Sequence, residues 1–134
     1  RYKMRGSYGA TEYGKVGIES AVSGADPHEL ISILFSQLKK ELVAAEYHCK
    51  AKNFELYSSK VTKANRILAG LQGSLDLEKG GEIADNLVEL YAFCIRQLTK
   101  ALTSKDAKII GEVAIVLNPV ITGWEEISPS RTAA

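Results

Sequence analysis

Residues 74–102, SLDLEKGGEIADNLVELYAFCIRQLTKAL, contain both the strongest chain break and the most apolar helical pattern of the sequence. Gly80 and Gly81 form its only adjacent glycine pair, and residues without a Cβ atom adopt backbone conformations that end a helix. Glu82 and Asp85 come next, and carboxylates are favoured in the first turn of a helix. The pattern therefore predicts a helix that begins at the glycine pair and runs to the end of this segment.

This helix is more apolar than packing in a bundle requires. Of the 20 residues from Ile83 to Leu102, 13 are apolar, whereas a bundle helix needs about three in seven. The apolar residues form two adjacent stripes with helical spacing. Either this is the most buried helix of the protein, or part of its surface faces a groove for a partner helix. Periodicity alone does not separate the two interpretations.

Two helices are predicted before this segment. Asp26 can cap the first, since Pro27 suits the first helical position and Glu29 can complete a capping box. The second follows residues 50–53 and weakens near Gly73. Its apolar seam has three-four spacing throughout and consists of Phe54, Tyr57, Val61, Ala64, Leu68, Leu71 and Leu75.

A fourth helix is predicted after the polar break at residues 103–106. Its apolar seam includes Ile110, Val113, Leu117 and Trp124. Pro119 lies inside this pattern and removes one backbone donor, so we expect it to kink or end the helix.

Four amphipathic segments joined by short polar breaks predict an all-α fold, an antiparallel up-down four-helix bundle over residues 26–126. Residues 1–25 are rich in glycine and are predicted to form a flexible N-terminal arm. The spacing of Ile18, Ala21 and Val22 predicts a short amphipathic helix within this arm. Residues 127–134 are predicted to be a loose C-terminal tail.

The composition argues against several classes of protein. The formal net charge of +1 gives no general attraction to nucleic acid. No window approaches 18 consecutive apolar residues, so no membrane insertion is expected. Cys49 and Cys94 are far apart and sit at apolar helical positions, which favours reduced, buried thiols and a cytoplasmic location.

No catalytic chemistry is predicted. His28 and His48 are the only histidines, and neither lies in a Glu-x-x-His pattern that would build a metal site in a bundle. No serine or cysteine has a histidine at a spacing that suggests a nucleophile and base. We therefore expect a protein that is not an enzyme, with no metal and no cofactor.

Several pieces of the chain, in order, resemble the flagellar secretion chaperone FliS family. Tyr13 followed by residues 17–35, GIESAVSGADPHELISILF, resembles the arm and first helix of that family. Residues 63–76, KANRILAGLQGSLD, resemble its second helix and turn, and residues 89–93, ELYAF, resemble its L-Y-x-[YF] signature. Asp106, Glu112-Val113 and Trp124 resemble its closing segment. The Asn118-Pro119 pair departs from the family, in which the last helix usually runs on to its tryptophan.

The resemblance implies a cytoplasmic export chaperone that binds the C-terminal segment of flagellin, one chaperone to one client. Binding would prevent premature polymerisation and keep the subunit competent for flagellar type III export. Export-apparatus components are further candidate partners. In the family, the arm tyrosine that Tyr13 resembles can cover the apolar binding surface when no client is bound.

By position, the client would lie on the neighbouring faces of the second and third predicted helices. Several of these residues must instead be core, and the sequence does not sort them. The predicted client-binding residues are Tyr13, Val61, Ala64, Ile67, Leu68, Leu71, Leu87, Leu90, Tyr91, Cys94 and Ile95. The alternative hypothesis is a structural or regulatory bundle that self-associates as a weak homodimer through this surface.

Overall fold

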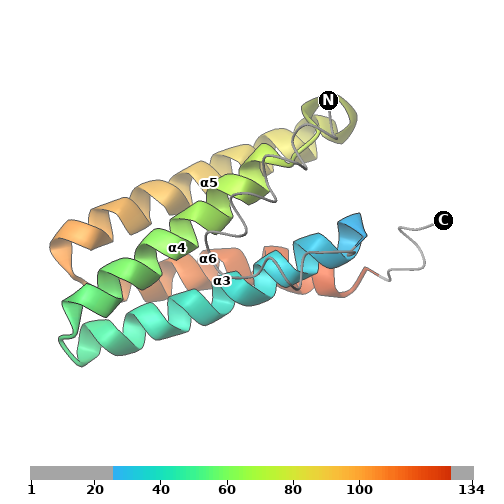
Figure 1. Cartoon of the computed structure of the whole chain (residues 1–134). Coiled ribbons are helices and arrows are strands. Elements are labelled where there is room, and N and C mark those ends of the chain that lie inside the picture. The colour runs from blue at the N-terminus through green and yellow to red at the C-terminus, as the bar shows by residue number, and fades with distance from the viewer. Residues whose placement is uncertain (1–25, 128–134) are drawn as a thin grey trace.

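The computed structural model describes residues 26–127. These residues form four helices and no strand: α3 (Pro27–Lys50), α4 (Phe54–Gly73), α5 (Leu77–Ser104) and α6 (Ala107–Glu125). Consecutive helices run in opposite directions (Figure 1), which confirms the predicted all-α, antiparallel four-helix bundle. The predicted N-terminal arm with Tyr13, and residues 128–134 of the predicted tail, lie outside the described residues.

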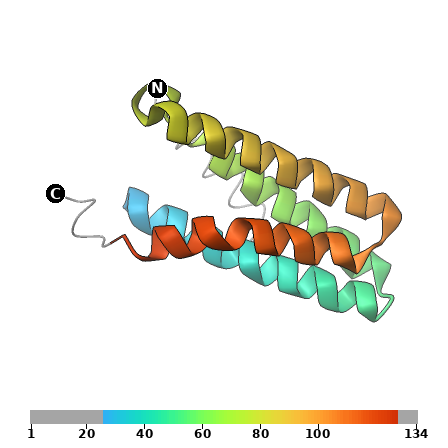
Figure 2. The same cartoon turned by 180° about the vertical axis from the view of Figure 1, so that it is seen from behind.

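Each helix contacts two others. α3 and α5 both pack against α4 and α6, and among the described residues neither diagonal pair is in contact. Seen from behind, α6 lies between α3 and α5 (Figure 2). The pair of α4 and α5 lies farther from the pair of α3 and α6 at the end where α3 begins (Figure 1).

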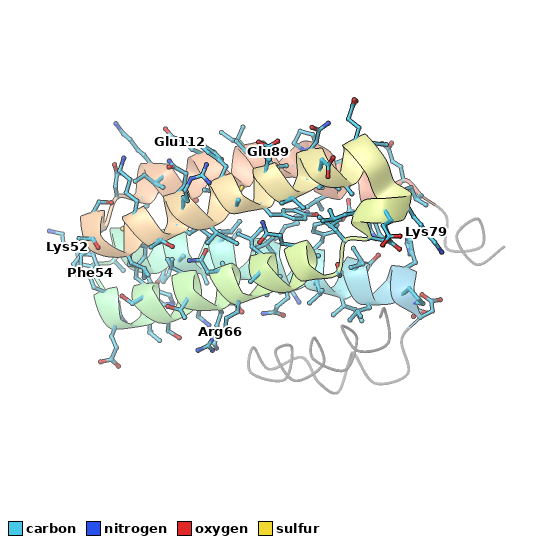
Figure 3. The ribbon with its side chains drawn as sticks, turned by 90° about the horizontal axis from the view of Figure 1, so that it is seen from above. Lys52, Phe54, Arg66, Lys79, Glu89 and Glu112 are labelled. Carbon is cyan, nitrogen blue, oxygen red and sulfur yellow. The ribbon has the colours of Figure 1, made fainter. Side chains whose placement is uncertain are left out.

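A side chain from the preceding turn caps each helix. The Asp26 carboxylate accepts a 2.7 Å hydrogen bond from the backbone N–H of Glu29 at the start of α3. Asn53, Asp76 and Asp106 accept equivalent bonds at the starts of α4, α5 and α6. Because such caps satisfy backbone donors that a helix leaves unpaired, the chain can reverse direction within a few residues. Figure 3 shows Lys52 and Phe54 at the α3–α4 turn and Lys79 at the opposite end of the bundle.

The glycine pair interrupts a helix that has already begun. Gly81 has φ 55° and ψ −131°, which no residue in a helix adopts, and the chain is helical on both sides of it. The predicted break and the helix that starts at the glycine pair are confirmed, and the helical stretch α5 also includes a short turn from Leu77 that precedes the break. Asp76 provides the earlier start, because its carboxylate caps the short helical turn that precedes Gly81.

Pro119 was expected to kink or end the last helix, and it does not end it. α6 continues through Pro119 to Glu125. The missing N–H of Pro119 frees the carbonyl of residue 115, four positions earlier. Both Pro119 and Ile115 are exposed, so water can reach that carbonyl. The loss of this one backbone hydrogen bond therefore costs little stability.

The core lies along the bundle axis and draws on all four helices. Tyr57, Leu68, Leu98 and Ile110 are among its largest fully buried side chains. Burial of a large apolar side chain contributes about 1.5–3 kcal/mol to folding. The predicted seams of α4 and α6 thus face inward, where they hold the bundle together.

Candidate functional site

An apolar cavity of about 440 Å³ lies at the end of the bundle where α3 begins and α6 ends. It occupies the region in which the two helix pairs diverge. All four helices and the turn between α4 and α5 contribute to its wall. The lining residues are Pro27, His28, Ile31, Phe35, Leu71, Ser74, Leu75, Asp76, Leu87, Tyr91, Val120, Trp124 and Ile127.

One wall of the cavity is aromatic and joins the first turns of α3 to the last turns of α6. The rings of His28 and Trp124 are stacked, with centroids 4.7 Å apart, and Phe35 meets Trp124 edge-on. The indole N–H of Trp124 donates a 3.0 Å hydrogen bond to the hydroxyl of Ser32. These contacts fix Trp124 against α3. The Nε2 atom of His28 is buried and has no hydrogen-bond partner among the described residues.

The opposite wall comes from α4 and α5. Leu71 and Tyr91 are almost fully buried, Leu87 is half-buried, and all three line the cavity. Burial raises the pKa of Tyr91 to about 12, so its hydroxyl stays neutral at ordinary pH. The side-chain amide of Gln72 donates a 2.9 Å hydrogen bond to the carbonyl of Val88 and holds the two helices together beside the cavity.

The structure separates the predicted client-binding residues into two groups. Three of them, Leu87, Leu90 and Ile95, are half-buried. Seven are buried in the bundle: Val61, Ala64, Ile67, Leu68, Leu71, Tyr91 and Cys94. The cavity brings together Leu71, Leu87 and Tyr91, whereas the other seven predicted residues within the described range do not line it.

Ten of the thirteen lining residues were not among the predicted client-binding residues. They include His28, Ile31 and Phe35 of α3, and Val120 and Trp124 of α6. The predicted up-down topology could have indicated these residues. An up-down bundle places the starts of α3 and α5 beside the ends of α4 and α6, so apolar residues near those four termini must meet at one end.

His28 and Asp76 line the cavity, but they do not belong to a metal-binding cluster of described residues. Among residues 26–127, no cluster of three or more histidine, cysteine, aspartate or glutamate side chains could hold a metal ion. Its wall is apolar apart from a few polar side chains at the helix ends. Such a site can bind apolar side chains and desolvate them, which is a binding function.

By length and composition, α6 is the one described helix that could cross a membrane. The core helix of a water-soluble bundle passes the same test. In this structure α6 contributes Ile110, Val113 and Leu117 to the core.

Comparison with known proteins places the chain in a family. Residues 9–131 match the family model described as flagellar protein FliS. The chain is 41% identical over 125 residues to the flagellar secretion chaperone FliS of Salmonella typhimurium, covering 92% of this chain and 93% of that protein.

Two further relatives agree. The flagellar secretion chaperone FliSB of Pseudomonas aeruginosa is 38% identical over 117 residues, which cover 87% of this chain and 93% of the relative. The flagellar secretion chaperone FliS of Vibrio cholerae is 31% identical over 126 residues, covering 94% and 91% of the two chains. The family model and these relatives span nearly the whole bundle, and the chain belongs to the FliS family of flagellar secretion chaperones.

Proposed function

We propose that this protein is a cytoplasmic export chaperone that binds the C-terminal segment of flagellin, one to one. By holding that segment it prevents premature polymerisation and keeps flagellin competent for flagellar type III export. A secretion chaperone needs a client protein, and family membership supplies that coarser function. The apolar cavity at the open end of the bundle is the observation that carries the finer proposal.

The chemistry of the cavity suits an amphipathic client. Its wall combines aliphatic side chains with the aromatic surfaces of Phe35 and Trp124. Apolar side chains spaced along one face of a client helix would enter such a space and leave the polar face in water. Beyond the cavity, Leu90 and Ile95 of α5 are also half-buried, and at about 100° per residue they lie on opposite edges of that helix. A client held at the cavity can extend along one of these edges, and not along both.

A chaperone can perform this role by binding its client reversibly, without a catalytic step. A segment that is disordered before binding loses conformational entropy when it is ordered, so its affinity is lower than the buried area alone would give. Release at the export apparatus then needs no covalent step. The absence of an enzymatic role remains part of the proposal.

A calorimetric titration tests the proposal directly. The full chain is titrated with a peptide from the C-terminal segment of flagellin of the same organism, and a scrambled peptide serves as the control. We expect saturation near one to one with the native peptide. Trp124 is the only tryptophan, and it lines the cavity. Its fluorescence should therefore change on addition of a tryptophan-free peptide.

The opposite result would be equally informative. No heat at several temperatures, together with no capture of flagellin by the immobilised chain, would show that the client is another protein. Saturation without any change in Trp124 fluorescence would support flagellin as the client but show that it binds away from the cavity.

A further inference from the structure

Tyr91 brings a phenolic hydroxyl to the largely apolar cavity. The residue is only 3% exposed, and it lines the cavity. The hydroxyl makes no hydrogen bond with any residue from 26 to 127, in contrast to the hydroxyl of Tyr57, which is bonded to a carbonyl in the core. A buried hydroxyl without a partner costs free energy. Phenylalanine would fill the same position without this cost, so the hydroxyl of Tyr91 calls for a partner that the bundle itself does not supply.

Ser74 provides a second hydroxyl on the same wall. It caps the end of α4 and also lines the cavity. Its hydroxyl donates a 2.8 Å hydrogen bond to the carbonyl of Leu71. A hydroxyl that has donated its proton can still accept, because its oxygen carries two lone pairs. The wall formed by α4 and α5 therefore offers a ligand one donor, from Tyr91, and one acceptor, from Ser74.

A neutral carboxamide matches this pair of groups. Its carbonyl oxygen accepts a hydrogen bond and its N–H donates one. A carboxylate has no N–H to donate, and no lysine or arginine lines the cavity to balance its charge. Burial of an unpaired charge costs far more than burial of an amide. A purely aliphatic ligand would leave the hydroxyl of Tyr91 without a partner.

We propose that the cavity recognises a carboxamide group of its client, and that Tyr91 is a specificity-determining residue that donates a hydrogen bond to the amide oxygen. Ser74 accepts the amide N–H. This inference rests on the proposed function, because the bound flagellin segment brings the amide. The amide belongs either to an asparagine or glutamine side chain or to a peptide group at the end of a client helix, where backbone carbonyls are unpaired. The surrounding apolar contacts supply most of the affinity, and the hydrogen bonds supply selectivity.

Benzamide tests the chemistry of the cavity without any client. The full chain is labelled with ¹⁵N, and the indole N–H signal of Trp124, the only tryptophan, reports on the cavity that it lines. We expect benzamide to shift this signal saturably, and we expect Tyr91→Phe to weaken its binding about fivefold. Isopropylbenzene has a similar shape and no polar group, so it should bind both chains equally. No saturable shift with benzamide, or equal binding of benzamide by both chains, overturns the proposal.

Titration with the C-terminal flagellin peptide identifies the source of the amide. Tyr91→Phe should bind the native peptide about fivefold more weakly. Peptides with one asparagine replaced by leucine, or one glutamine by methionine, are titrated against both chains. The peptide that lacks the recognised side chain should bind both chains equally. If every replacement leaves the difference unchanged, the amide is a peptide group of the client backbone.

Two controls separate recognition from a structural effect. Tyr57→Phe removes a tyrosine hydroxyl that is bonded to Ala101 in the core, and it should bind the peptide as the native chain does. Tyr91→Phe should unfold at neutral pH with no loss of stability, because its hydroxyl has no partner to lose among the described residues.

The outcomes for the inference and for the proposed function are distinct. A Tyr91→Phe chain that binds the peptide normally, or one that loses stability together with binding, contradicts the role of Tyr91 and leaves flagellin as the client. A native chain that binds no flagellin peptide contradicts the proposed function, and the benzamide titration then decides whether the cavity recognises an amide.

Discussion

The hydroxyl of Tyr57 donates a 2.7 Å hydrogen bond to the backbone carbonyl of Ala101. Both residues are fully buried. The same carbonyl also accepts a hydrogen bond from the backbone N–H of Lys105. Lys105 has a left-handed backbone conformation and caps the C-terminal end of α5. The start of α4 is thereby joined to the last turn of α5, at the end of the bundle opposite the cavity.

Tyr57→Phe should lower the free energy of unfolding by about 1 kcal/mol, because it removes this hydrogen bond and keeps the ring. Urea denaturation measures the change. Tyr47→Phe is the matched control, since the Tyr47 side chain is 67% exposed, and it should change the stability by a few tenths of a kcal/mol at most. Equal effects of the two substitutions would show that the bond to Ala101 contributes nothing.

Stability should fall at alkaline pH. Burial raises the pKa of Tyr57 and of Tyr91 from 10.0 to about 12, and it raises the pKa of Cys94 from 9.0 to about 11. These groups lose their protons at lower pH in the unfolded chain than in the native one. The stabilisation is therefore complete below the unfolded pKa values and is lost as pH rises through the folded ones.

Denaturation midpoints recorded between pH 9.0 and about 12 test this dependence. Tyr91→Phe should reduce the slope of stability against pH above the ordinary tyrosine pKa, because one of the titrating groups is gone. A native chain whose stability stays constant over this interval would contradict the burial of these side chains.

Leu87→Asp should abolish client binding while the bundle remains helical. Leu87 is half-buried at the cavity, and a carboxylate there would need to be desolvated on binding. Asn86→Asp adds the same charge at the adjacent, exposed position and should bind normally. Titration calorimetry with the flagellin peptide measures both.

Ile95→Asp extends the test along α5, where we also expect loss of binding. At least one of the two aspartate variants should leave a folded protein. If both only unfold the bundle, as followed by circular dichroism, the half-buried surface of α5 belongs to the core and client contact there is excluded.

His28→Phe should keep the stack on Trp124 and stabilise the protein slightly. The Nε2 atom of His28 is buried without a partner among the described residues, and an unsatisfied buried polar atom costs about 1–3 kcal/mol. Thermal unfolding of the two chains gives the difference. A large loss of stability would show that the imidazole makes a polar contact that phenylalanine cannot replace.

Gly81→Ala should destabilise the chain by about 1–3 kcal/mol, because φ 55° with ψ −131° is strained for any residue with a Cβ atom. No atom would meet the new methyl group within 4 Å, so the cost is purely conformational. Gly73→Ala is the control, since its site is equally open and its φ is not positive. It should be neutral or stabilising. Equal changes in the urea midpoint would show that Gly81 is not strained.

Local signals in the sequence were sufficient to predict the helices. Asp26, Asp106 and the Gly80-Gly81 pair mark helix ends or breaks through backbone chemistry that acts within a few residues. The sequence could not decide whether the helix ends at Pro119, because the cost of the lost hydrogen bond depends on whether water reaches one carbonyl, and tertiary packing decides that. Asp76 was overlooked as a cap because the glycine pair gave a stronger signal four residues later.

The candidate site was harder to predict because a seam residue and a groove residue have the same helical period. Leu68 and Leu87 look equivalent in the sequence, yet Leu68 is fully buried and Leu87 lies at the cavity. What separates them is the divergence of the two helix pairs at one end, which is a property of the assembled bundle. The contribution of Trp124 and His28 follows from the same divergence.

The contact pattern of the four described helices also implies an order of folding. Three of the four interfaces join helices that are consecutive in the chain, and only the interface of α3 with α6 joins the first to the last. Contacts between distant segments form later because closing a long loop costs more entropy. The Trp124–Ser32 bond and the His28–Trp124 stack belong to that last interface. We therefore expect the cavity to be completed late in folding, and a chain whose α6 has not yet docked to have no complete site for a client.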